Sequence, residues 1–77
     1  MKIEVLGSGC PKCLELEKRV REAVRLLGLN ATVEHVYDLN KIIARNVFST
    51  PALAIDGIVV SSGRLLTADE IAAVIRK

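Results

Sequence analysis

The segment from Lys2 to Leu27 constrains the fold more than any other part of the chain. Lys2 to Leu6 is a short β-rich run, and the Gly-Ser-Gly that follows allows the backbone to turn sharply. From Pro11 to Leu27, apolar residues recur at spacings of three and four, as on one face of an amphipathic helix. The sequence therefore predicts a strand, a tight loop and a long helix in direct succession.

Both ends of this helix carry local signals. Pro11 suits a first helical position, where no N–H is needed, and Gly28 can take the left-handed conformation that ends a helix. Thr32 to Tyr37 is β-branched and alternating, which indicates a second strand. Because a helix connects the two strands, we expect them to be parallel and to form a βαβ unit.

A shorter helix is predicted next, over Leu39 to Asn46, with Asp38 as its N-cap. Its apolar residues Leu39, Ile42 and Ile43 are expected to pack on the sheet.

The last third of the chain predicts a hairpin and a helix. Pro51 to Asp56 and Ile58 to Ser61 are strand-like and are separated by a turn whose Gly57 supplies the positive φ of a primed hairpin turn. Thr67 and Glu70 then form a T-x-x-E capping box. The apolar residues that follow at helical spacing are Ile71, Val74 and Ile75.

The predicted order is β-α-β-α-β-β-α, an α/β arrangement whose four-stranded mixed sheet must be covered by helices. A chain of 77 residues has room for one domain, residues 1–77. The net charge of +2, with acidic and basic residues interspersed and only 3% aromatics, does not indicate a nucleic-acid binder. No apolar run has the length of a signal peptide or a membrane span, so we expect a cytoplasmic protein with no membrane partner.

The only two cysteines, Cys10 and Cys13, form a CxxC pair at the start of the long helix. Such a pair in a cytosolic chain is catalytic, redox-sensing or metal-binding rather than a permanent cross-link. The helix N-terminus and its N–H groups favour a thiolate on Cys10, whereas the periodicity places Cys13 on the inward face. We therefore expect Cys10 to attack and Cys13 to resolve, with Gly9, Pro11 and Lys12 as supporting residues.

A metal site is the alternative reading of the pair. Structural zinc needs four ligands, and the only histidine, His35, lies midway along a predicted strand, where a surface or half-buried role is expected. A carrier of Cu(I) or zinc also places a CxxC between its first strand and first helix. Such carriers end in a strand, however, whereas this chain is predicted to end in a helix. A further alternative is an iron-sulfur cluster held by thiols from two chains, which one sequence does not exclude.

Taken in order, CPKC after a strand and loop, the long helix, Ser-Thr-Pro, the Ile-Asp-Gly turn and the final Thr-Ala-Asp-Glu-Ile resemble the thioredoxin-like fold. More narrowly, the chain is similar to small archaeal and bacterial redox-active disulfide proteins of glutaredoxin size. The resemblance implies a thiol-disulfide oxidoreductase that exchanges a Cys10–Cys13 disulfide with protein disulfides, as a reductant. It also implies that a flavoprotein disulfide reductase donates the electrons. We expect no cofactor beyond the redox-active disulfide, and the default expectation for the oligomeric state is a monomer.

The resemblance also implies roles for residues outside the pair. The proline matching Pro51 is cis beside the cysteines in that family, where it keeps the site in shape, and Thr50 would offer its backbone to an extended substrate. The alternative is that Pro51 merely begins an edge strand. Glu4 stands six residues before Cys10, at the offset of a buried acid that assists proton transfer in thioredoxins. A solvated glutamate at a sheet edge is the alternative for Glu4.

The chain departs from two branches of this family. Gly9 stands where ordinary thioredoxins have a tryptophan. Ser62, Gly63 and Arg64 stand where glutathione-using glutaredoxins have two glycines and an acidic residue. The resemblance therefore does not extend to glutathione as a substrate.

Overall fold

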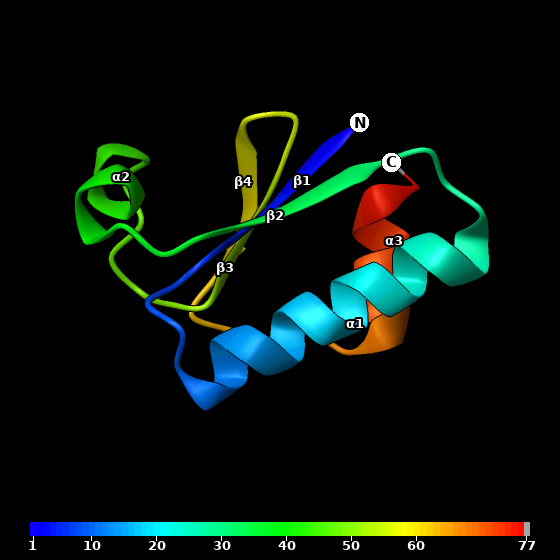
Figure 1. The fold of residues 1–77 in the computed structure, drawn as a ribbon, viewed down its shortest axis with the longest axis horizontal. Coiled ribbons are helices and arrows are strands. Elements are labelled where there is room, and N and C mark those ends of the chain that lie inside the picture. The colour runs from blue at the N-terminus through cyan, green and yellow to red at the C-terminus, as the bar shows by residue number, and fades with distance from the viewer. Residues whose placement is uncertain (77) are drawn as a thin grey trace.

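The computed structural model, which describes residues 1–76, has its helices and strands in the predicted order (Figure 1). The end of the predicted domain, at Lys77, lies outside the described residues. The elements are β1 (Lys2–Leu6), α1 (Pro11–Leu27), β2 (Thr32–Val36), α2 (Leu39–Ala44), β3 (Ala52–Ile55), β4 (Ile58–Ser62) and α3 (Ala68–Ile75).

The strands form one four-stranded sheet in the order β2-β1-β3-β4. β1 pairs with β2 in parallel, whereas β1 with β3 and β3 with β4 are antiparallel. The predicted mixed sheet and the parallel βαβ unit are therefore confirmed. Strands β1 and β3 are central, and β1 leads directly into the loop that carries the cysteine pair.

Helices cover both faces of the sheet because residues of β1 point alternately to either side. Ile3 and Val5 join the larger apolar cluster with residues of α1 and α3, which pack against each other on one face (Figure 1). Leu6 joins a smaller cluster on the other face, where Ile42 of α2 lies. The larger cluster consists of Ile3, Val5, Leu16, Val20, Ala23, Leu53, Leu66, Ile71 and Ile75.

The predicted bounds of β1 and α1 are confirmed, as are the local signals that end helix α1, begin helix α3 and form the hairpin turn. Helix α1 ends at Gly28, which has a φ of 63°. The capping box of Thr67 and Glu70 is present at the start of α3. Asp56 and Gly57 have φ angles of 51° and 86°, as a type I′ hairpin turn requires. None of the helices described in residues 1–76 is long and apolar enough to cross a membrane.

The prediction for α2 is wrong in two respects. The helix ends two residues earlier than expected, and Asn46 has a φ of 61°, which no helix accommodates. Only Ile42 is buried, whereas Leu39 is 61% and Ile43 44% exposed. A helix of six residues has fewer than two turns, so only one of its apolar positions reaches the sheet. The predicted bounds of three strands also differ from the structure by one residue. Strand β2 ends at Val36, β3 is shorter by one residue at each end, and β4 extends to Ser62.

We expect the buried face of α1 to carry the stability of this helix. Leu16 is 0% exposed and Leu26 is 67% exposed. Leu16→Ala should lower the free energy of unfolding by about 2–5 kcal/mol because it opens a cavity in the larger cluster. Leu26→Ala, the same substitution on the outer face, should change it by no more than about 0.5 kcal/mol. Urea denaturation of the reduced protein measures both, and equal effects would contradict the assigned core.

Candidate functional site

The two cysteines lie on either side of the first residues of α1 and occupy different environments. Cys10 is the N-cap residue, with φ −66° and ψ 163°, and it is partly exposed. Its Sγ accepts a hydrogen bond from the backbone N–H of Cys13 at 3.3 Å. Cys13 is fully buried on the inward face of the helix, as the periodicity predicts. Both are free thiols, so the pair is in its dithiol form.

These environments move the two thiol pKa values in opposite directions. The pKa of Cys10 is lowered, chiefly because the Cys13 thiol donates a hydrogen bond to its sulfur, with help from the backbone N–H of Cys13. A smaller contribution comes from the backbone N–H of Lys12. The pKa of Cys13 is raised, first by burial and then by its hydrogen bond to Cys10. Cys10 is therefore the thiol that ionises first, and only thiolates attack disulfides.

The backbone of Gly7 forms one wall of the Cys13 site. A Cβ atom at Gly7 would lie 2.3 Å from Cys13 Sγ, a distance that no side chain tolerates. The same position is 3.8 Å from the Cβ of Thr50, so Thr50 lies beside this wall. Gly7 also donates its N–H to the carbonyl of Val36 at 3.0 Å. Sequence reasoning assigned Gly7 only to a turn, because the approach of Cys13 depends on the packing of α1.

The loop before β3 contains a cis Thr50–Pro51 bond, the isomer implied by the resemblance. Pro51 is fully buried, and its carbonyl accepts the N–H of Gly63 at 2.9 Å. It precedes β3, which lies between β1 and β4. The alternative interpretation of Pro51 as the start of an edge strand is therefore wrong. Thr50 itself is exposed.

The remaining predicted supporting residues surround Cys10. Gly9 has a φ of 92°, and a Cβ there would approach the Tyr37 ring at 3.3 Å, so both its conformation and its surroundings favour glycine. Pro11 is the first helical residue, as predicted, and is exposed. The Lys12 side chain is also exposed, and it is the backbone N–H of this residue that acts on Cys10.

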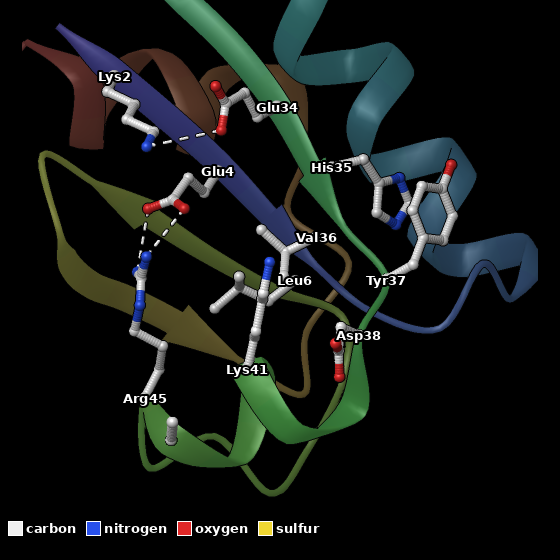
Figure 2. A pocket seen from close by; sticks show the side chains of 11 residues that line it. Lys2, Glu4, Leu6, Glu34, His35, Val36, Tyr37, Asp38, Lys41 and Arg45 are labelled. Carbon is white, nitrogen blue, oxygen red and sulfur yellow. Dashed lines mark hydrogen bonds and ion pairs between the residues drawn. The ribbon is translucent and has the colours of Figure 1, made fainter.

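Glu4 is buried, at 3% exposure, and is not a solvated edge residue. Both of its carboxylate oxygens accept hydrogen bonds from Arg45, at 3.0 and 2.9 Å, so the buried charge is paired in a fork geometry. Figure 2 shows these two contacts as dashed lines. Both side chains line a hollow of about 520 Å³ beside α2. Neither cysteine lines this hollow. Sequence reasoning missed Arg45 because it lies far from Glu4 along the chain.

His35 is half-buried, within the predicted range, and its side chain is only 4% exposed. Its ring lies between Glu17 of α1 and the carbonyl of Gly7, and it stacks on Tyr37 (Figure 2). Within residues 1–76, no three side chains of His, Cys, Asp and Glu are grouped so that they could hold a metal ion.

Comparison with known proteins gives a consistent picture. The family model described as "Thioredoxin domain" matches residues 1–76. A protein named thioredoxin from Methanothermobacter thermautotrophicus is 39% identical over 71 residues, which cover 92% of each chain. A protein named thioredoxin from Methanocaldococcus jannaschii is 41% identical over 69 residues, which cover 90% of this chain and 79% of the relative.

The hydrogen bond between the two thiols predicts the pH dependence of alkylation. In the wild type, iodoacetamide should modify Cys10 before Cys13, and the rate at Cys10 should reach half its maximum below the ordinary pKa of a cysteine. Cys13→Ala removes the thiol donor, so this midpoint should move to higher pH. Cys13→Ser keeps a hydroxyl donor and should move it less. Mass spectrometry of timed samples measures both rates, and identical midpoints in the two variants would contradict the assigned cause.

Proposed function

The chain belongs to the thioredoxin domain family and is a thiol-disulfide oxidoreductase, and on this premise we propose that Cys10 is its attacking thiol and Cys13 its resolving thiol. One observation carries the assignment. The partly exposed Cys10 Sγ accepts a hydrogen bond from the backbone of Cys13, whose own sulfur is fully buried behind it. A substrate disulfide can therefore reach the thiol whose pKa is lowered and not the thiol whose pKa is raised.

The proposed reaction has two exchange steps. The Cys10 thiolate attacks one sulfur of the substrate disulfide, and a mixed disulfide forms while the first substrate thiolate leaves and takes up a proton. Cys13 then gives up its proton and attacks Cys10 Sγ. The Cys10–Cys13 disulfide forms, and the second substrate thiolate leaves and is protonated. The substrate gains two electrons and two protons, which the dithiol has lost.

Thr50 and Pro51 are the proposed substrate-binding residues. Thr50 is exposed, and its Cβ lies near Gly7, the residue whose backbone forms a wall of the Cys13 site. An extended peptide beside this loop could pair with the Thr50 backbone, as in other cases of strand addition. Pro51 is fully buried, and the chain enters β3 directly after it.

The physiological setting is proposed from the family and the cysteine pair together. The protein acts as a reductant of protein disulfides in the cytoplasm, as one domain and as a monomer. A flavoprotein disulfide reductase returns two electrons to the Cys10–Cys13 disulfide. The chain itself uses no cofactor beyond this disulfide. A reducing compartment suits a chain whose only cysteines are an exchange-competent pair.

Redox titration tests this function directly. The purified protein is equilibrated in thiol-disulfide buffers of defined potential, alkylated, and analysed by mass spectrometry to count free thiols, with a metal assay in parallel. We expect one reversible two-electron transition that links Cys10 to Cys13. Failure to form this disulfide, together with stoichiometric bound copper or zinc, would overturn the proposal.

The order of attack can be tested with two matched variants. Cys13→Ser should trap a mixed disulfide between Cys10 and a disulfide-containing substrate such as oxidised insulin, because the second exchange step is removed. Cys10→Ser should form no such adduct and should lose turnover, since the remaining Cys13 is buried. Non-reducing electrophoresis and mass spectrometry detect the adduct. An adduct on Cys13 in Cys10→Ser, at a comparable rate, would reverse the assigned roles.

A further inference from the structure

The side chain of His35 is a buried polar group for which the exchange reaction described above has no use. His35 lies on the edge strand β2, opposite Val5 of β1, and its side chain is only 4% exposed. Burying a polar ring is unfavourable unless its nitrogens find partners. Its two partners lie on two different segments, namely the loop that leads to Cys10 and helix α1, which begins after Cys10.

The ring bridges α1 and the loop after β1. Nδ1 lies 2.5 Å from Oε1 of Glu17, and Nε2 lies 3.1 Å from the carbonyl oxygen of Gly7. A carbonyl oxygen only accepts hydrogen bonds, and so does an ionised carboxylate. The ring therefore makes both contacts when both nitrogens carry protons. Arg21 binds the other oxygen of Glu17 at 2.9 Å, and together His35 and Arg21 lower the pKa of Glu17, which keeps this carboxylate ionised.

Both the N–H and the carbonyl of Gly7 form hydrogen bonds with residues of β2. Its N–H donates to the carbonyl of Val36 at 3.0 Å, and its carbonyl accepts from His35. Cys13 Sγ lies against the Cα of the same residue, at the place where a side chain would stand. The position of the Gly7 wall therefore depends on the hydrogen bond from His35.

The aromatic neighbour of His35 extends this support toward Cys10. The rings of His35 and Tyr37 are stacked, with centroids 3.9 Å apart and planes inclined by 7° (Figure 2). The Tyr37 ring in turn lies close to Gly9, the residue before Cys10. The stacked pair, with His35 on β2 and Tyr37 just after it, thus contacts the loop at both Gly7 and Gly9.

We propose that His35 is a positioning residue for the resolving step: by holding the Gly7 carbonyl, it fixes the wall against which Cys13 Sγ lies and so sets the rate at which Cys13 attacks Cys10. His35 acts on Cys13 through Gly7, since its two ring nitrogens are engaged by Glu17 and by the Gly7 carbonyl. The inference rests on the proposed function.

Ellman's reagent separates the two exchange steps in one experiment. The reduced protein attacks the reagent through Cys10 and releases one thionitrobenzoate, and Cys13 then displaces the second thionitrobenzoate from the mixed disulfide. Stopped-flow absorbance therefore shows a reagent-dependent first phase and a reagent-independent second phase. The second phase reports the resolving step alone.

Two substitutions of His35 and one control substitution separate its hydrogen bonds from its stacking on Tyr37. His35→Phe keeps a ring to stack on Tyr37 and loses both hydrogen bonds. His35→Gln retains an amide N–H that can reach the Gly7 carbonyl. Glu34→Gln is the control, because Glu34 is the neighbouring residue on β2, its side chain is 50% exposed, and it pairs only with Lys2 at 3.6 Å.

We expect His35→Phe to slow the second phase roughly five- to tenfold, the effect of losing about one net hydrogen bond, while the first phase stays within about twofold of wild type. His35→Gln should restore most of the second-phase rate, and Glu34→Gln should change neither phase. Both His35 variants lose the Glu17 contact and should lose stability in urea, so a purely structural role would slow both alike.

Two results would overturn the inference: a second phase in His35→Phe as fast as in wild type, or one in His35→Gln as slow as in His35→Phe. If His35→Phe does not fold, His35→Asn replaces it, because the shorter amide cannot reach Gly7 while its chemistry matches Gln. Failure of the proposed function itself would be distinguishable, because wild type would then release no second equivalent.

Discussion

The fold depends on the burial of both faces of β1. Ile3 and Val5 pack under α1 and α3 while Leu6 packs toward α2, so one short strand joins the two apolar clusters of the protein. The exception on this strand is Glu4, whose charge is matched by both guanidinium contacts of Arg45. Because β1 continues directly into the Gly7 loop and α1, the strand that organises the core also fixes the position of the cysteines.

The difference between the two thiols follows from where the helix places them and from the hydrogen bond between them. Cys10 precedes the first helical turn and faces its unpaired N–H groups, whereas Cys13 lies one turn further on, against the core. Two neighbouring glycines leave the space that this arrangement needs. Gly7 and Gly9 lack the side chains that would collide with the Cys13 sulfur and the Tyr37 ring, respectively.

Local patterns were sufficient for most elements, and long-range pairs were not predictable from them. The periodicity of α1, the capping box at Thr67 and the turn at Asp56–Gly57 act within a few residues, so the sequence predicted them well. The short helix α2 was overestimated because periodicity does not reveal how many turns reach the sheet. The Glu4–Arg45 and Glu17–His35 contacts join residues 41 and 18 positions apart, and no local spacing indicates such partners.

The arrangement of the chain ends has a consequence for how the domain can be anchored. β1 runs from Met1 toward the cysteine loop, and α3 runs back so that it ends near the N-terminus (Figure 1). Asp56 secures this end of the sheet, since its carboxylate and its N–H bind the backbone of Lys2 at 2.8 Å each. A linker or a solid support attached at Met1 would therefore leave from the end of the molecule opposite Cys10, and a tethered copy would still present its thiols to large protein substrates.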